Sequence, residues 1–144
     1  MKLDFIKNQP KYFEFIRNLR NDPEIKKGFI KQEDISKENH LSYMAKYNKH
    51  YYICLYDQDP IGYIGIVKND LRLAVSNKYQ NQGVATFMLN EITKLKNDFD
   101  VLIKVDNIKS INFFTKHSFV KKDRLIKDGI NLIRMKYDTK INKT

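Results

Sequence analysis

Residues 71–85, LRLAVSNKYQNQGVA, constrain the fold of this chain more than any other stretch. An apolar run that predicts a strand, LRLAV, leads through a polar turn, SNKYQNQG, into a helix predicted to begin at Val84. The first backbone N–H groups of a helix have no partner within it and lie at the positive end of its dipole. This arrangement is suited to bind a phosphate group, because Gly83 lets an anion approach the backbone closely.

The spacing of the turn, Q-x-x-G-x-A from Gln80 to Ala85, differs from the patterns G-x-x-x-x-G-K-[ST] and G-x-G-x-x-G. It therefore disfavours a site for a nucleoside triphosphate or a dinucleotide. On these residues alone, an ordinary strand–turn–helix connection is the simpler interpretation.

A second block, NIKSINFFTKHSF at residues 107–119, follows after a predicted helix and strand. Together the two blocks resemble the GNAT superfamily of acetyl-CoA-dependent N-acetyltransferases. The family's cofactor loop reads [RQ]-x-x-G-x-[GA], and its later block commonly reads N-x-x-[SA]-x-x-[FL]-[YF]-x-K-x-G-F. The resemblance is clear over residues 69–119 and implies an acyltransferase that uses acetyl-CoA as co-substrate. We propose no metal, because the three histidines show no ligand spacing.

Periodicity and turn residues predict the elements along the chain. Strands are predicted at residues 2–6, 51–56, 61–67, 71–75, 101–105, 119–126 and 130–137, and helices at about residues 10–21, 84–96 and 110–116, with a further helix after Ser36. The fold class is α/β, with a GNAT-like mixed, mostly antiparallel central sheet and flanking helices. The resemblance implies that the fourth and fifth strands splay apart around the cofactor.

Composition predicts one domain, residues 1–137, with a frayed tail at residues 138–144. No run approaches the roughly 20 apolar residues of a membrane span, and the N-terminus lacks the apolar segment of a signal peptide, so we expect a cytoplasmic protein without a membrane partner. The net charge of +10 is spread along the chain, which fits an anionic ligand but does not predict nucleic-acid binding. A single cysteine, Cys54, excludes an internal disulfide.

The resemblance also implies roles for individual residues. Backbone groups of Leu73, Ala74 and Val75 would hold the pantetheine arm and orient the acetyl carbonyl. The pyrophosphate would bind to the backbone of the loop and first helical turn, namely Gln80, Asn81, Gln82, Gly83, Val84, Ala85 and Thr86. Contacts on the far side of the cofactor would come from Asn107, Ser110, Phe113 and Phe114. An amine would attack the thioester carbonyl directly, and the CoA thiolate would leave.

The residues for proton transfer depart from the family pattern. Phe114 occupies the position of a tyrosine that often protonates the leaving thiolate, and phenylalanine cannot donate a proton. A water or another tyrosine would then act as the acid, or the thiolate would leave unaided, since thiols have a pKa of about 8.5. Asp70 and His40 are the candidate general bases; the alternatives are a turn aspartate and a structural helix histidine. Ser118 replaces the glycine that the family has before Phe119.

Residues 19–23, LRNDP, with His40 downstream, narrow the choice of acceptor. They resemble the GNAT branches that acetylate nucleotide-linked amino sugars and the branch that acetylates the N-termini of ribosomal proteins. Arg20 and Asn21 are the predicted substrate contacts, because an arginine fork can pair with a diphosphate. The alternative is an ordinary helix end before a proline. Tyr43, Tyr47, Tyr51 and Tyr52 would either stack on a sugar or nucleobase or lie in the core.

The sequence thus predicts an acetyl-CoA-dependent N-acetyltransferase whose acceptor is the amine of a nucleotide-activated amino sugar. The alternatives are an enzyme that acetylates protein N-termini, polyamines or other small amines, and a catalytically silent acyl-CoA-binding module. The predicted partner is a small-molecule amine, with no nucleic acid. GNAT proteins often dimerise, and the C-terminal hairpin would offer an exposed strand for a homodimer.

Overall fold

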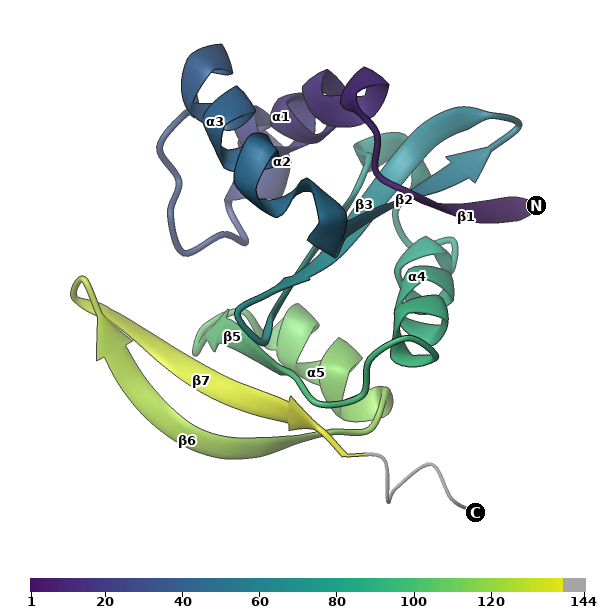
Figure 1. The fold of residues 1–144 in the computed structure, drawn as a ribbon. Coiled ribbons are helices and arrows are strands. Elements are labelled where there is room, and N and C mark those ends of the chain that lie inside the picture. Colours follow the sequence, from purple (N-terminus) through teal and green to yellow (C-terminus); the bar gives the residue numbers. More distant parts are fainter. Residues whose placement is uncertain (139–144) are drawn as a thin grey trace.

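A seven-stranded sheet lies at the centre of the molecule, and helices cover both of its faces (Figure 1). The computed structural model describes residues 1–138, so the tail predicted for residues 138–144 lies outside the described part except for Asp138. The strands are β1 (Leu3–Lys7), β2 (Tyr51–Tyr56), β3 (Asp59–Val67), β4 (Asp70–Val75), β5 (Asp100–Lys104), β6 (Phe119–Lys127) and β7 (Ile130–Tyr137). The helices are α1 (Phe13–Asn21), α2 (Pro23–Lys26), α3 (Lys37–Tyr47), α4 (Val84–Thr93) and α5 (Ile108–Lys116), with short 3-10 helices η1 (Pro10–Tyr12), η2 (Asn48–His50) and η3 (Asn77–Tyr79).

The sheet is mostly antiparallel and has the strand order β1-β2-β3-β4-β5-β7-β6. The exception among the strands of residues 1–138 is the pair β4 and β5, which run parallel. Their ladder pairs Asp70 with Asp100 and no other residues of the described chain, so the two strands diverge toward Val75 and Lys104. The predicted fold class is therefore confirmed, including the splayed fourth and fifth strands.

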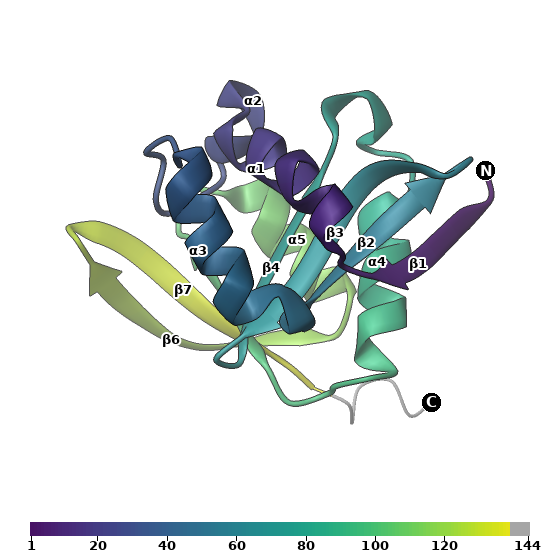
Figure 2. The ribbon, with the colours of Figure 1, turned by 45° about the horizontal axis from the view of Figure 1, so that its top comes forward.

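Each face of the sheet carries its own apolar core. α4 covers one face with Val84, Met88 and Ile92, which lie on one side of the helix and are almost fully buried. On the other face, α1 and α3 bury Ile16 and Met44 completely. Figure 2 shows α1 and α3 on the opposite side of the sheet from α4 and α5. Burial of one large aliphatic side chain contributes about 1.5–3 kcal/mol, so both cores hold the sheet firmly between its helices.

Helix boundaries follow the capping residues of the sequence. The Ser36 hydroxyl accepts a hydrogen bond from the Asn39 backbone N–H at 3.1 Å, which confirms the predicted start of α3. α4 ends at Thr93, before the predicted end at residue 96. Leu95, within the predicted helix of residues 84–96, lies beyond its end and is 61% exposed.

The turn between β3 and β4 is shorter than the predicted turn of residues 68–70. Lys68 and Asn69 alone form it, and both have positive φ values of 53° and 64°. Such two-residue turns match the twist of the strands they join. Asp70 is therefore the first residue of β4 and not a turn residue.

Candidate functional site

The opening between β4 and β5 exposes backbone groups of β4. The Ser76 N–H donates to the Ile61 carbonyl of β3 at 2.8 Å. Because successive residues of a strand point their backbone groups to opposite sides, Ala74 also faces β3, whereas Leu73 and Val75 face β5. In the described chain, β5 pairs with β4 only at Asp100, so the backbone groups of Leu73 and Val75 line the opening.

The backbone groups of Leu73 and Val75, two of the predicted pantetheine contacts, thus face the opening, and those of Ala74, the third, do not. The backbone of Ala74 pairs with Tyr63 of β3 and is not turned toward the opening. Only its side chain, on the α1 and α3 side, lies close to the site.

The loop after β4 leads into α4 through a residue with a left-handed backbone. Gly83 has a φ of +83° and forms the N-cap of α4 without any side-chain cap. A Cβ added at Gly83 would meet nothing within 4 Å, so the space beside this residue is open. Asn81 also has a positive φ, +62°, and the Gln82 side chain fastens the loop by donating to the Lys78 carbonyl at 3.0 Å.

The first turn of α4 presents the donors that the phosphate-binding prediction needs. The Phe87 N–H donates to the Gly83 carbonyl at 2.9 Å, which is the first bond of the helix. The preceding N–H groups, from Val84, Ala85 and Thr86, therefore have no acceptor inside the helix. The space beside Gly83, at the start of this turn, is open, an arrangement that can hold a pyrophosphate.

The predicted contacts on α5 have mixed surroundings. The Asn107 side-chain oxygen caps α5 by accepting from the Ser110 backbone N–H at 3.2 Å. Phe113 packs against His117 with ring centroids 4.5 Å apart. Phe114 is buried, with its ring 4.9 Å from that of Phe119, so the position of the family's tyrosine is part of the core in this chain.

The end of α5 is joined to the start of α4 by one side-chain contact. The Thr86 hydroxyl and the His117 Nε2 atom lie 3.1 Å apart. Burial, with a smaller effect from Lys116, lowers the pKa of His117, which keeps its imidazole neutral at pH 7. Ser118, where the family pattern has a glycine, has a φ of +73°, the left-handed conformation that glycine adopts most easily.

A polar cluster occupies the face of β4 toward α1 and α3. The Arg72 Nη1 atom donates to the Tyr43 hydroxyl at 2.7 Å, and the Tyr43 and Tyr51 hydroxyls are 2.6 Å apart. The Arg72 Nε atom lies 3.5 Å from an oxygen of Asp70. Burial raises the pKa of the Asp70 carboxyl, and Arg72 offsets only part of this effect. Arg72 was missed in the sequence, although a charge inside the apolar run LRLAV was a usable signal.

Arg20 extends this cluster from the end of α1. Its guanidinium carbon lies 5.1 Å from the centroid of the Tyr43 ring. The Nη1 atom is buried and has no hydrogen-bond partner, and no ion pair within residues 1–138 includes Arg20. A buried guanidinium N–H without an acceptor costs free energy, so an anion placed here would be stabilised.

Asn21 and His40, two other predicted site residues, are engaged by the protein itself. The Asn21 amide donates to the Ile35 carbonyl at 3.0 Å and accepts from the Ile35 N–H at 2.7 Å. His40 has no exposed surface, and its Nε2 atom is 2.8 Å from the Phe13 carbonyl. Since a carbonyl only accepts, Nε2 carries the proton. In this arrangement Asn21 holds the segment before α3, and His40 joins α3 to α1. Neither side chain is free to contact the substrate that accepts the acetyl group.

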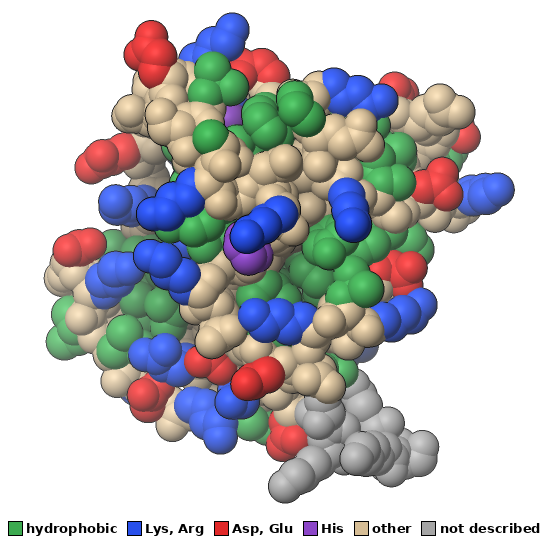
Figure 3. All heavy atoms as spheres, viewed as in Figure 1, with side chains coloured by type: hydrophobic (Ala, Val, Ile, Leu, Met, Phe, Trp, Pro, Cys, Tyr) green, Lys and Arg blue, Asp and Glu red, His purple; other side chains and the backbone are tan. Residues whose placement is uncertain are grey.

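Within the described residues, neither a charged patch seen in Figure 3 nor a set of metal ligands marks a second candidate site. Figure 3 shows Lys and Arg side chains spread over this face of the molecule and mixed with acidic ones. Within residues 1–138, no group of three or more His, Cys, Asp or Glu side chains could hold a metal ion. None of the described helices is both long enough and apolar enough to span a bilayer.

The comparison with family models decides the assignment of this fold and loop. The model of the acetyltransferase (GNAT) family matches residues 13–119. The chain belongs to the GNAT acetyltransferase family. This GNAT protein is therefore an acyltransferase, an acetyl-CoA-dependent N-acetyltransferase. Among curated proteins, the comparison found no match.

Solved structures of GNAT enzymes share the fold of this chain at low sequence identity. A spermidine N-acetyltransferase from Vibrio cholerae, in complex with CoA and spermine, has a TM-score of 0.79 and 16% identity, covering 92% of this chain and 93% of that one. A ribosomal-protein-alanine N-acetyltransferase from Brucella melitensis has a TM-score of 0.79 and 14% identity, covering 94% and 98%. Ard1 from Thermoplasma volcanium has a TM-score of 0.74 and 15% identity, covering 94% and 96%. The acceptors named for the first two enzymes, a polyamine and a ribosomal protein, differ widely, so the fold alone does not select an acceptor.

Proposed function

We propose that this GNAT enzyme transfers acetyl from acetyl-CoA to the amine of a nucleotide-activated amino sugar. The observation that carries the proposal is the buried Nη1 atom of Arg20, which has no hydrogen-bond partner. Arg20 lies against Tyr43 on the face of β4 toward α1 and α3, which we take as the side that binds the acceptor. Arg72 places a second guanidinium on the same side, and both contact Tyr43. A guanidinium fork pairs well with the oxygens of a diphosphate.

The same two guanidinium groups argue against a polyamine acceptor. Spermine, the ligand of the Vibrio cholerae enzyme, carries several positive charges at neutral pH. Like charges repel, and the repulsion is stronger at partly buried sites than in bulk water. Asp70, the acidic group on this face, is already paired with Arg72.

For the cofactor, we propose the residues of the opening and its loop. The backbone of Leu73 and Val75 would hold the pantetheine arm and place an N–H at the thioester oxygen, where negative charge develops. The N–H groups of residues 80–86 would bind the pyrophosphate, with Gly83 leaving room for it. Asn107, Ser110 and Phe113 would border the opposite side.

In the proposed reaction the neutral amine attacks the thioester carbonyl, a tetrahedral oxyanion forms, and the C–S bond then breaks. Asp70 lies three residues from Leu73 on β4, which is about 10 Å along a strand. A water must therefore carry the amine's proton if Asp70 is the base. Phe114 cannot protonate the thiolate, which leaves as the anion and takes a proton from solvent.

We also propose that the enzyme acts in the cytoplasm and forms a homodimer. The free, buried Cys54 suits a reducing compartment. β6 is the outer strand of the sheet, so one of its edges is open to pairing, and Ile126 near its end is 71% exposed. Light scattering on the purified protein tests the dimer.

The test of the acceptor is acetyl-CoA-dependent thiol release with a panel of amines. The panel contains a UDP-linked 4-amino sugar, N-terminal peptides of ribosomal proteins, and spermidine. Release with the sugar nucleotide alone is the expected result. Release with a peptide or with spermidine, and not with the sugar nucleotide, would overturn the proposed acceptor while leaving acetyl transfer intact.

A further inference from the structure

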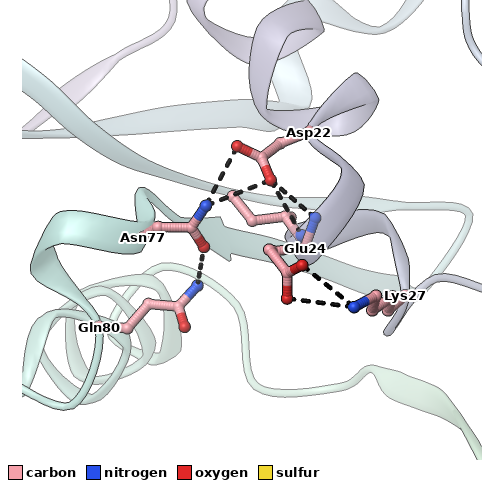
Figure 4. A network of polar contacts seen from close by, with 6 residues as sticks. Asp22, Glu24, Lys27, Asn77 and Gln80 are labelled. Carbon is pink, nitrogen blue, oxygen red and sulfur yellow. Dashed lines mark hydrogen bonds and ion pairs between the residues drawn. The ribbon is translucent and has the colours of Figure 1, made fainter.

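Asp22, at the junction of α1 and α2, is bonded to the cofactor loop far along the chain. Both oxygens of its carboxylate accept from the Asn77 amide nitrogen, at 3.2 and 3.1 Å. Asn77 is the first residue of η3, two residues after Val75, where β4 ends. Figure 4 shows the two side chains pointing toward one another across the gap between these elements.

The contact continues from Asn77 to residues that we assign to the cofactor. The Asn77 side-chain oxygen accepts from the Gln80 amide nitrogen at 3.3 Å. The same nitrogen of Gln80 donates to the Val75 carbonyl at 3.1 Å. Asp22 is thus connected through two amide side chains to the strand that lines the opening and to the loop that precedes α4.

The Asp22 carboxylate is itself held in place. It caps α2 by accepting from the backbone N–H groups of Glu24, at 2.9 Å, and Ile25, at 3.3 Å. Burial alone would raise the pKa of Asp22, but these bonds and the Asn77 amide outweigh it and hold the pKa below its ordinary value. The carboxylate is therefore ionised at pH 7, and the contact is a charge-assisted one.

A second contact ties the same segment to the other arm of the opening. The Lys104 ammonium group, at the end of β5, donates to the Lys27 carbonyl at 3.1 Å. The segment of residues 22–27 is therefore fastened to β4 through Asn77 and to β5 through Lys104. A cofactor bound between β4 and β5 would therefore lie between the two strands to which this segment is fastened.

We propose that Asp22 is a positioning residue that couples the acceptor side of the site to the acetyl-CoA loop. Through Asn77 and Gln80 it holds the loop in its binding arrangement. Acetyl-CoA in turn orders residues 22–36, the stretch between α1 and α3 that begins two residues after Arg20. Coupling of this kind is reciprocal, so each substrate strengthens the binding of the other. The inference rests on the proposed cofactor loop.

The chain offers a reciprocal exchange to test the contact. Asp22→Asn removes the charge and replaces the oxygen that lies 3.1 Å from the Asn77 amide nitrogen with a second amide nitrogen, and Asn77→Asp places two carboxylates opposite each other. The double variant restores one donor and one acceptor, with an acceptor still available for Gln80 and for the cap of α2. Glu24→Gln is the matched control, because its partner in Figure 4 is Lys27, within the same segment.

Two measurements decide the proposal: calorimetric titration with acetyl-CoA, and hydrogen exchange with and without it. We expect each single variant to weaken acetyl-CoA binding by about fivefold, the exchange variant to recover to within about twofold, and Glu24→Gln to bind like wild type. In wild type, acetyl-CoA should slow exchange at residues 80–86 and at residues 22–36, and in Asn77→Asp only at residues 80–86.

Hydrogen exchange distinguishes a failure of the Asp22 coupling from a failure of the proposed cofactor loop. Protection of residues 80–86 without residues 22–36 in wild type overturns the coupling, as does unchanged binding in both single variants. No protection of residues 80–86 in wild type overturns the cofactor loop. A failure of the double variant to recover, with a normal melting temperature, contradicts the direct role of the Asp22–Asn77 contact.

Discussion

Arg20 and Asn21 are neighbours in the sequence, yet the structure gives their side chains different surroundings. Asn21 uses both ends of its amide on Ile35, whereas Arg20 has a buried N–H without an acceptor. Natural proteins seldom leave such a group unpaired. The difference makes Arg20 the better candidate for an acceptor contact, and it could not be read from the motif LRNDP.

Replacement of Arg20 tests this view at the level of one side chain. Arg20→Gln should raise KM for the sugar nucleotide about 10- to 100-fold, which corresponds to losing hydrogen bonds to a charged group. The acetyl-CoA affinity should stay unchanged. Steady-state kinetics measure the first effect and calorimetry the second. Arg124→Gln, on an exposed part of β6, is the control and should behave like wild type. An unchanged KM in Arg20→Gln would contradict the assignment.

Gly83 allows strain and site blockage to be separated. Gly83→Ala should weaken acetyl-CoA binding at least tenfold, because the added methyl group enters the open space beside the loop. A positive φ also costs a non-glycine residue about 1–2 kcal/mol. Gly129→Ala, in the β6–β7 turn, has nearly the same φ, +77°, and equal open space, so it carries the strain alone. Equal losses of affinity in both variants would show that the loss does not arise at the cofactor loop.

At the level of elements, the contact between α1 and α3 depends on a buried, neutral histidine. Burial is the largest influence and lowers the pKa of His40. The unfolded chain therefore binds a proton below about pH 6.5 while the folded protein does not, so stability falls as the pH drops below that value and is fully present above it.

Urea unfolding at pH 7.5 and pH 5.5 measures this dependence. Wild type should be less stable at pH 5.5, and His40→Gln should remove most of the difference while lowering stability at pH 7.5. His117→Gln should remove a smaller part, since burial lowers the pKa of the less buried His117 as well. A wild-type protein with equal stability at both pH values would refute this account.

The β2–β3 turn offers a stabilising change at the same scale. Asp57 and Gln58 have φ values of 48° and 68°, the conformation of turns that favour Asp-Gly. Gln58→Gly should raise the free energy of unfolding by about 1 kcal/mol, because it removes the strain of a glutamine at positive φ. Thermal melting measures the gain, and acetyl-CoA affinity should not change. A lower melting temperature would mean that the Gln58 side chain stabilises the turn.

At the scale of the whole molecule, the net charge of +10 should act on the rate of cofactor capture. Acetyl-CoA is a polyanion, and a positive protein attracts it over distances that salt shortens. The association rate constant from stopped-flow measurements should fall several-fold between 50 and 500 mM NaCl, with a smaller change in the dissociation rate. If the dissociation rate constant changed as much as the association rate constant, salt would be acting on the bound complex and not on the approach of the cofactor.

Features formed by residues that are close in the sequence were predicted, whereas contacts between residues far apart in the sequence were missed. The strand, Gly83 and the start of α4 are contiguous, so local patterns located this strand, turn and helix, and the resemblance to the GNAT family then supplied the fold class. The contact of Tyr43 with Arg72 joins residues 29 positions apart, and that of Asp22 with Asn77 joins residues 55 apart. Such pairs depend on how α1 and α3 pack on the sheet. The direction of the Ala74 backbone likewise depends on strand register, which no single-strand pattern contains.

The single rung between Asp70 and Asp100 makes the sheet two smaller sheets that share an edge. One holds β1 to β4, the other β5, β7 and β6, and the exposed turn after α4 is the covalent link between them. A break in that turn would yield two fragments, each with its own complete hydrogen-bonded strands. We expect such fragments to associate through the apolar core under α4 and α5, and acetyl-CoA, which we propose binds between β4 and β5, to favour their reassembly.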